Sequence, residues 1–209
     1  RFIVPEKRAN EVLGFLRQPL GDLCISRPKA RLSWGIELPF DPDYVCYVWF
    51  DALLNYYSAL SFGWAGDKTG AFWPADLHLI GKDILTTHAV YWPTMLMGAG
   101  LPLPRTILAH GWWLFGAENE KMSKSKGNVV KPLETMDVYG RDVLRYFLMR
   151  EMTPGMDSSF SEGLIVERNN GELANDIGNG LNRVTKLVET HFAGQLPAGA
   201  GYGEAERAL

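Results

Sequence analysis

Three lysines and two serines fall within residues 121–128, and the stretch ends on a glycine and an asparagine. Lysine places a compact positive charge on a flexible stem, so a loop of this composition could meet negative charge that develops on a phosphate group. Small serines, with Gly116 and Gly127 nearby, would let such a loop close and reopen. A solvated surface loop is the plainer alternative, and the surrounding sequence has to decide between the two.

The composition of the chain is that of a globular protein. Of its 209 residues, 46% are hydrophobic and seven are tryptophan, which is enough to bury a sizeable core. A net charge of −3 with an isoelectric point near 5.8 argues against binding to nucleic acid by bulk charge but permits local basic patches, so any RNA contact must be local. Cys24 and Cys46 are too far apart for a metal knuckle and imply no disulfide framework, so we expect a reduced, cytoplasmic setting. We find no membrane-spanning apolar run and expect no membrane partner.

Strands that alternate with helices are expected to position the lysine loop. The apolar run Tyr44–Trp49 predicts a strand, and residues 50–60 repeat at helical spacing. The unit recurs with a buried strand at Leu77–Ile80, a tight turn at Gly81 and a helical stripe that includes His88. Residues 105–115 add another apolar strand directly before the loop. This order predicts an α/β chain with a Rossmann-like parallel sheet, whose ligands bind at the carboxyl ends of the strands.

Helices dominate the sequence after the loop. Residues 131–151 read as helical pieces broken at Gly140, with Pro132 suited to a first helical position. A connector rich in Pro, Gly and Ser covers residues 153–163, and from Ser161 onward the residue pattern predicts helix. An apolar stripe predicts that one face of the last helix packs, and it consists of Leu173, Ile177, Leu181, Val184 and Val188. A second, α-helical bundle domain is therefore expected to begin here.

Residues Lys121–Ser125 match, letter for letter, a signature of the class I aminoacyl-tRNA synthetases. A five-residue match of this kind arises by chance in roughly one chain in ten thousand of this size. The resemblance implies that Lys124 is the main contact to the phosphates of ATP, that Lys121 supports it, and that Ser123 and Ser125 belong to the same ATP-binding loop. The chemistry agrees, because an amino-acid carboxylate that attacks the α-phosphate makes negative charge grow on the departing pyrophosphate.

The segments 47–56, 79–104 and 109–128 resemble the methionyl-tRNA synthetase family and cover most of the chain. The resemblance implies that five residues line a methionine pocket, namely Trp49, Ala52, Leu53, Tyr56 and His88. An unbranched thioether is well held by aromatic rings with a few polar groups that fix its orientation. Some family members have proline in place of Leu53. For the tryptophan and the histidine the plain alternative is a role as core residues.

Further resemblances concern the nucleotide. Gly81 and Asp83 are similar to a strand-to-helix turn beside the ATP ribose, where a carboxylate can accept from hydroxyls, although Asp83 could also be an ordinary helix N-cap. Glu37 is a weaker match to the same site. ATP is expected as a substrate with Mg²⁺, and no metal site is expected in this chain.

The family's second signature, an H-x-G-H stretch, has no match among the four histidines. The inserted connective domain, which often holds zinc, has no match either. We therefore expect this chain to be the C-terminal half of a catalytic domain, inactive alone, that needs the N-terminal half of the same protein. The boundaries expected from the sequence are 1–112 for the Rossmann-like half, 113–160 for the loop and a stem-contact region, and 161–209 for the start of a helical anticodon-binding domain.

Asparagines and basic residues occupy the polar side of the last helix. Asn179 and Arg183 resemble the family's anticodon-reading pair, and such side chains can hydrogen-bond splayed bases of single-stranded RNA, here the anticodon of a methionine tRNA. The plain alternative is a solvated face. The sequence thus favours a methionine–tRNA ligase fragment, with another class I synthetase or a noncatalytic tRNA-binding module as alternatives.

Overall fold

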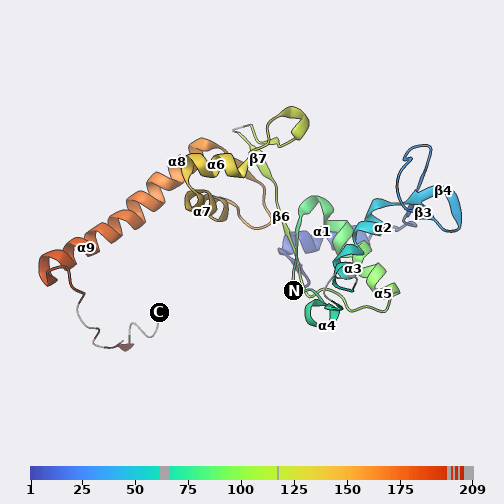
Figure 1. Ribbon diagram of the computed structural model, residues 1–209, viewed down its shortest axis with the longest axis horizontal. Helices are drawn as coiled ribbons and strands as arrows, with labels where there is room; N and C mark the ends of the chain where they lie inside the picture. The colour runs from blue at the N-terminus through green and yellow to red at the C-terminus, as the bar shows by residue number, and fades with distance from the viewer. Residues whose placement is uncertain (62–65, 117, 197–198, 200, 202, 205–209) are drawn as a thin grey trace. The chain divides into compact units, whose positions relative to one another are not determined.

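The computed structural model describes residues 1–61, 66–116, 118–196, 199, 201 and 203–204, which form two compact units (Figure 1). The first unit contains Arg1–Trp113 and Met152–Ser158, and the second contains Leu114–Glu151 and Ser159–Leu209. The elements of the first unit are β1 (Ile3–Val4), α1 (Glu6–Leu16), β2 (Ser26–Pro28), β3 (Glu37–Leu38), β4 (Asp41–Cys46), α2 (Val48–Ala52), α3 (Asn55–Ser61), α4 (Thr69–Phe72), β5 (His78–Gly81), η1 (Lys82–Ile84), η2 (Thr87–Tyr91), α5 (Trp92–Gly98) and β6 (Ile107–His110).

A parallel sheet with the strand order β1-β6-β5 forms the centre of the first unit. Its middle strand pairs on both sides, so that Ile107 lies opposite Ile3 on one neighbour and opposite His78 on the other. The parallel sheet predicted from the sequence is therefore confirmed. Its strands β5 and β6 lie in the regions predicted at 77–80 and 105–115.

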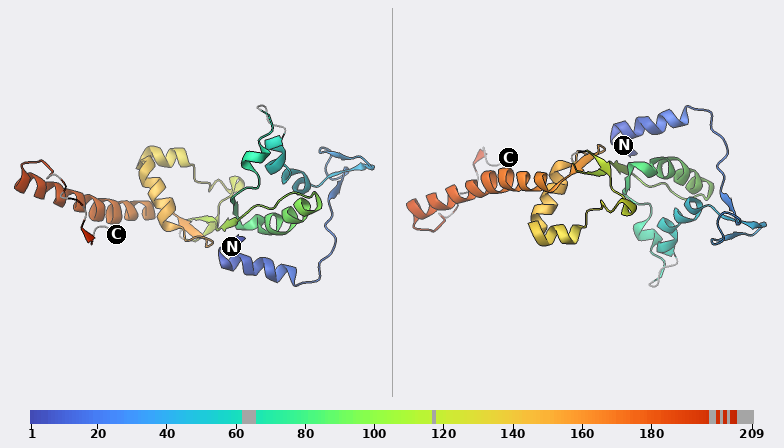
Figure 2. Two further views of the ribbon diagram at one scale, coloured as in Figure 1. Left: turned by 90° about the horizontal axis from the view of Figure 1, so that it is seen from below. Right: turned by 90° about the horizontal axis from the view of Figure 1, so that it is seen from above.

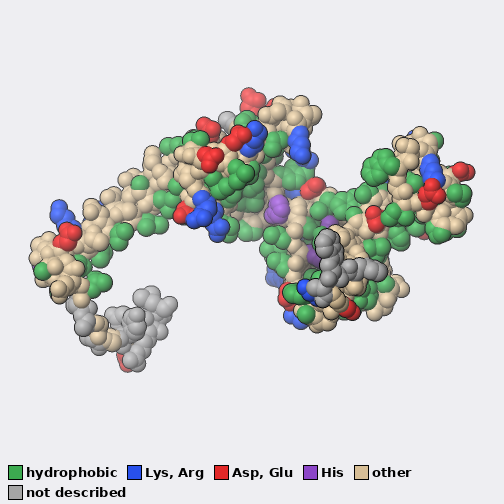
Figure 3. Space-filling view, viewed as in Figure 1, with side chains coloured by type: hydrophobic (Ala, Val, Ile, Leu, Met, Phe, Trp, Pro, Cys, Tyr) green, Lys and Arg blue, Asp and Glu red, His purple; other side chains and the backbone are tan. Residues whose placement is uncertain are grey.

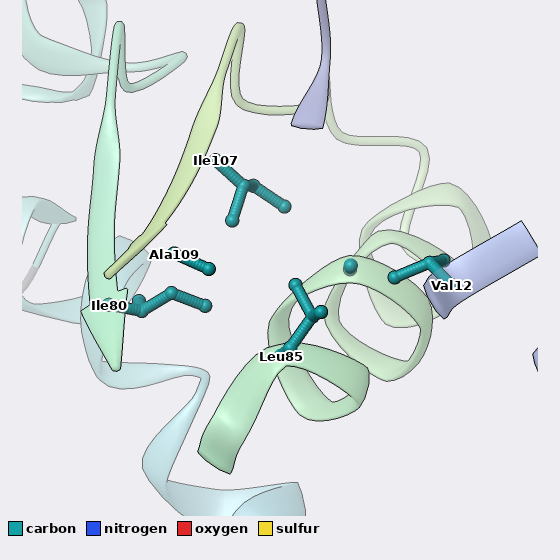
Figure 4. Packing of buried hydrophobic residues seen from close by; sticks show 6 residues of the cluster. Val12, Ile80, Leu85, Ile107 and Ala109 are labelled. Carbon is teal, nitrogen blue, oxygen red and sulfur yellow. The ribbon is translucent and has the colours of Figure 1, made fainter. Parts of the chain in front are cut away.

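One face of this sheet packs against helices and forms the core (Figure 4). Period-2 alternation brings Ile80, Ile107 and Ala109 to that face, where they meet Leu85 and Val12 of the covering helical segments. Leu79 points the other way and is 65% exposed. The expectation of a buried strand at Leu77–Ile80 therefore holds for His78 and Ile80 but is wrong for Leu79, because no described residue covers the second face of the sheet there.

The predicted strand at Tyr44–Trp49 differs from the structure in its extent and its partners. The strand β4 ends at Cys46 and lies in an antiparallel sheet of order β2-β4-β3. The prediction of a parallel strand here is wrong because only two residues separate β3 from β4, and so short a connection joins antiparallel neighbours. Trp49 consequently lies on helix α2.

The helical stripe after Gly81 forms as predicted, but with irregular winding. It begins as a 3₁₀ turn η1, passes through a π-helical turn η2 and continues as α5. Such single π turns are frequent at functional sites. The stripe buries His88, Trp92 and Leu96.

The second unit combines a small sheet with helices. Its sheet has the order β8-β7-β9, and Leu114 pairs with Lys121 in the β7–β8 hairpin. Apart from the first residues of β7 and β9, which are assigned to the first unit, its elements are β7 (Trp113–Phe115), β8 (Glu120–Lys121), η3 (Lys124–Lys126), α6 (Pro132–Tyr139), α7 (Arg141–Glu151), β9 (Ser158–Phe160), α8 (Glu162–Arg168), η4 (Asn169–Gly178) and α9 (Asn179–Phe192). Pro132 begins α6 and Gly140 separates α6 from α7 with a φ of 90°, as the sequence predicts.

Aromatic packing and ion pairs hold the helices of the second unit together. Phe147 of α7 meets Phe160 edge to face, with ring centroids 5.4 Å apart. Arg168 pairs with Glu151 at 2.8 Å and with Glu172 at 2.9 Å, which joins α8 to both neighbouring segments. Ser161 caps α8 by accepting from the N–H of Leu164 at 3.3 Å.

The segments α8, η4 and α9 run on as one rod (Figure 2), along which hydrophobic side chains remain at the surface (Figure 3). Ile177, Leu181 and Val184 are between 56% and 65% exposed. The prediction that this face packs is wrong for the part of the chain that the structure describes, because no described residue covers it. The amphipathic pattern itself is present.

Candidate functional site

Aromatic and histidine side chains from α2, α3 and η2 converge in the first unit. The ring of His88 lies 5.9 Å from that of Trp49 and 5.6 Å from that of Tyr56, both approximately edge to face. Leu53, 1% exposed, is buried with Trp92 in the cluster against which Trp49 packs. Four of the five predicted pocket residues therefore lie in one neighbourhood, while Ala52 is exposed at the end of α2.

Hydrogen bonds define the protonation of His88. Its Nδ1 lies 3.0 Å from the carbonyl oxygen of Ile84, which can only accept, so Nδ1 bears the proton. Nε2, 3.0 Å from the Tyr56 hydroxyl, then accepts a hydrogen bond from that hydroxyl. Burial lowers the pKa of His88 and raises the pKa of Tyr56. Both side chains are therefore neutral at neutral pH, which leaves a polar but uncharged wall.

His78 is a member of this cluster that the sequence reasoning missed. It is 5% exposed, its ring lies 4.5 Å from that of Tyr56, and its Nε2 accepts from the indole N–H of Trp92 at 3.2 Å. Burial, and then the charge of His88, lowers the pKa of His78 to about 4. The available signal was its position on the same strand face as Ile80, two residues later.

A cleft of about 330 Å³ opens beside this cluster. Of the five predicted pocket residues, Tyr56 lines the cleft and the other four do not. Its walls are Tyr56, Leu60, Phe72, Trp73, Ala75, Leu77, His78 and Leu79.

The Gly81–Asp83 turn lies at the carboxyl end of β5, where ligands of parallel sheets bind. The carboxylate of Asp83 accepts from the indole N–H of Trp112 at 3.2 Å, and Asp83 is exposed. Its predicted alternative as an N-cap is not realised, because the turn begins at Gly81 without a side-chain cap. Glu37 lies on β3 and pairs with Lys29 at 2.5 Å.

The lysine loop belongs to the second unit. Lys121 ends strand β8, and Lys124 begins the short turn η3, which Gly127 closes with a φ of 71°. The hydroxyls of Ser123 and Ser125 lie 2.8 Å apart. Among the described residues the side chain of Lys124 has no ion-pair or hydrogen-bond partner, and it is exposed.

Asn128 holds this loop together and was not predicted. Its side-chain oxygen accepts from the backbone N–H of Ser123 at 2.7 Å, and its amide nitrogen donates to the carbonyl oxygen of Lys121 at 3.4 Å. Asn128 thus links the end of β8, which bears Lys121, to the start of the turn that bears Lys124.

Asn179 and Arg183 lie one helical turn apart on α9, and both are exposed. Within the described residues, no three His, Cys, Asp or Glu side chains gather in a way that could hold a metal ion. None of the described helices is long and apolar enough to span a membrane.

Comparisons with known proteins agree on one family. The family described as "tRNA synthetases class I (M)" matches residues 3–185. Methionine–tRNA ligase from Caldanaerobacter subterraneus is 48% identical over 209 residues, which are 100% of this chain and 32% of that protein. The Brucella suis enzyme of the same name is 48% identical over 208 residues, covering 100% of this chain and 40% of the relative.

Solved structures give the same result. Mycobacterium tuberculosis methionyl-tRNA synthetase bound by methionyl-adenylate is 46% identical with a TM-score of 0.81, covering 99% of this chain and 40% of that one. Its apo form is 42% identical with a TM-score of 0.78, covering 99% and 39%. The chain thus spans about a third to two fifths of the length of the relatives it matches.

Proposed function

Because the chain belongs to the family of class I tRNA synthetases (M), we propose that it supplies part of a methionine–tRNA ligase used in protein biosynthesis in the cytoplasm. The whole enzyme would join methionine to ATP as methionyl-adenylate and then transfer methionine to its tRNA. In this proposal residues 1–112 are the second half of the catalytic domain, 113–160 the loop and stem-contact region, and 161–209 the start of a helical-bundle anticodon-binding domain. The N-terminal half of the same protein completes the site.

The convergence of Trp49 and Tyr56 on His88 is the observation that best supports this function. Aromatic faces and edges make favourable contacts with a thioether sulfur. Since both polar groups among them are neutral and already hydrogen-bonded, the wall suits an uncharged, unbranched side chain. With Ala52 and Leu53, these residues form the proposed methionine pocket.

The lysine loop is proposed to act on the triphosphate. Lys124, exposed and free of an ion pair among the described residues, can turn toward the phosphates, and Lys121 with Ser123 and Ser125 supports the closed loop. Gly81 and Asp83 are proposed to bind the ribose. Glu37 could join the nucleotide site only after it leaves Lys29. The Mg²⁺ that accompanies ATP would be coordinated largely by phosphate and water oxygens.

Asn179 and Arg183 are proposed to read anticodon bases of the methionine tRNA. Both side chains are exposed on one side of α9, which allows them to hydrogen-bond unstacked bases.

Methionine-dependent exchange of pyrophosphate into ATP by the full-length protein tests the function. Trp49→Ala should raise the KM for methionine about tenfold or more and leave the KM for ATP nearly unchanged. Trp34→Ala is the matched control, because Trp34 is 74% exposed and lies outside the cluster. Equal weakening of both substrates by Trp49→Ala would favour a core role.

The same assay addresses the alternatives. Exchange that depends on another amino acid would indicate a different class I synthetase. No exchange with any amino acid would favour a noncatalytic tRNA-binding module.

A further inference from the structure

The segment Met152–Ser158 belongs to the first unit, although the residues on either side of it belong to the second. It is seated tightly. Arg8, 7% exposed, donates to the carbonyl oxygen of Gly155 at 2.6 Å. A Cβ atom at Gly111 would lie 1.9 Å from the carbonyl oxygen of Met156, so only glycine fits beneath the segment. The backbone before Asp157 is therefore fixed at the carboxyl end of β6.

Asp157 uses both of its carboxylate oxygens in this position. Oδ2 accepts from the ammonium of Lys82 at 2.6 Å, and Oδ1 accepts from the backbone N–H of Trp112 at 2.9 Å. These hydrogen bonds, from Lys82 first and then from Trp112, lower the pKa of the carboxyl group, so it is ionised at neutral pH.

Lys82 and Trp112 continue from Asp157 to the nucleotide side of the turn. The ammonium of Lys82 lies over the Trp112 ring, 4.2 Å from its centroid, and the indole N–H of Trp112 donates to Asp83 at 3.2 Å. The ring of Trp112 thus contacts the ammonium of Lys82, and its indole N–H is hydrogen-bonded to Asp83. The orientation of the Asp83 carboxylate follows from that of the indole.

We propose that Asp157 is a positioning residue of the ATP site, which holds Lys82 and Trp112 so that Asp83 faces the ribose hydroxyls. This inference rests on the proposed function. Without Asp157, the ammonium of Lys82 loses its partner and can turn to the neighbouring Asp83, whose oxygens are then withdrawn from the ribose. A carboxylate held in advance in its binding orientation binds more tightly than one that must be reoriented.

The exposure of the ion pair separates this role from a purely structural one. The side chains of Lys82 and Asp157 are 21% and 32% exposed, and ion pairs of this kind contribute little to stability. Loss of the charge should therefore affect the substrate that Asp83 binds far more than the melting temperature.

Pyrophosphate exchange by the full-length protein tests the proposal with Asp157→Asn, which keeps an oxygen for the Trp112 N–H and removes the charge. We expect the KM for ATP to rise about five- to tenfold, while the KM for methionine changes less than about twofold and the melting temperature stays within about 2 °C. With 2′,3′-dideoxy-ATP, which lacks the ribose hydroxyls, the difference between variant and wild type should largely vanish. Asp76→Asn is the matched control, because Asp76 forms an exposed ion pair with Arg105 elsewhere in the first unit.

The outcomes are distinct. An unchanged KM for ATP, an equal rise in both KM values, or the same defect with ATP and the dideoxy analogue would overturn the role of Asp157 while leaving the proposed function intact. A wild-type protein without methionine-dependent exchange would instead refute the proposed function, and the ribose-orienting role with it.

Discussion

We expect His78 to make the protein less stable as the pH falls below neutral. The side chain is 5% exposed, and its Nε2 accepts the indole N–H of Trp92. Protonation would place a charge in a buried aromatic cluster and remove this acceptor. Burial, and then the charge of His88, lowers the pKa of His78 from 6.5 to about 4 in the folded chain.

The sign and size of the effect follow from the two pKa values. Because the folded state takes up the proton only near pH 4 while the unfolded state takes it up near pH 6.5, stability is complete above pH 6.5 and declines between these values. The full loss is about 3 kcal/mol, of which about 2 kcal/mol falls between pH 7 and pH 5. The lowered pKa of His88 acts in the same direction.

Urea unfolding of the full-length protein, followed by tryptophan fluorescence at pH 7 and pH 5, measures this loss. His78→Gln keeps an oxygen that can accept from Trp92 but cannot titrate, so it should lose about 2 kcal/mol less than wild type over this interval. His191→Gln on the exposed side of α9 is the control and should behave as wild type. The reasoning fails if wild type and His78→Gln lose equal stability.

Three further variants test other parts of the chain. Lys124→Ala should slow adenylate formation roughly 10²-fold with little change in methionine affinity, and near-normal pyrophosphate exchange would contradict its role. Gly111→Ala should destabilise by about 1–3 kcal/mol in thermal unfolding because its Cβ would lie 1.9 Å from a backbone oxygen, whereas Gly14→Ala, with open space around it, should be neutral or stabilising. Equal melting of the two glycine variants would be the contrary result. Asn179→Ala combined with Arg183→Ala should leave exchange intact and cost about 1–3 kcal/mol in tRNA recognition, and unchanged discrimination against anticodon-substituted tRNA would return this helix face to a merely solvated one.

Elements with strong local signals were predictable from the sequence. The break at Gly140 and the start of α6 at Pro132 follow from backbone preferences of single residues. The direction of β4 was not predictable from its apolar run, since the run is the same for a parallel and an antiparallel strand. The decisive neighbour, β3, has two residues and no recognisable pattern.

The proposed site divides in the same way. The lysine loop could be predicted because its residues are contiguous, and the pocket residues were predicted from the resemblance alone. Asp157 was missed, since it meets Lys82 across 75 positions of sequence, and such a contact depends on the tertiary fold. His78 was overlooked for a different reason, because a histidine inside an apolar strand gives no sign of its partner until Trp92 is placed.

The helix α9 separates what a sequence pattern specifies from what it leaves open. Its apolar residues recur on one side, and Asn179 and Arg183 occupy the other, so the pattern fixes which face is suited to burial. Yet Leu181 and Val184 are 65% and 56% exposed among the described residues. Amphipathic spacing encodes a face that gains free energy when it is covered, but it contains no information about the surface that covers it. The polar face needs no covering surface, because the helix backbone, whose hydrogen bonds are internal, already sets the positions of its side chains. Base recognition by α9 can therefore be tested at two side chains.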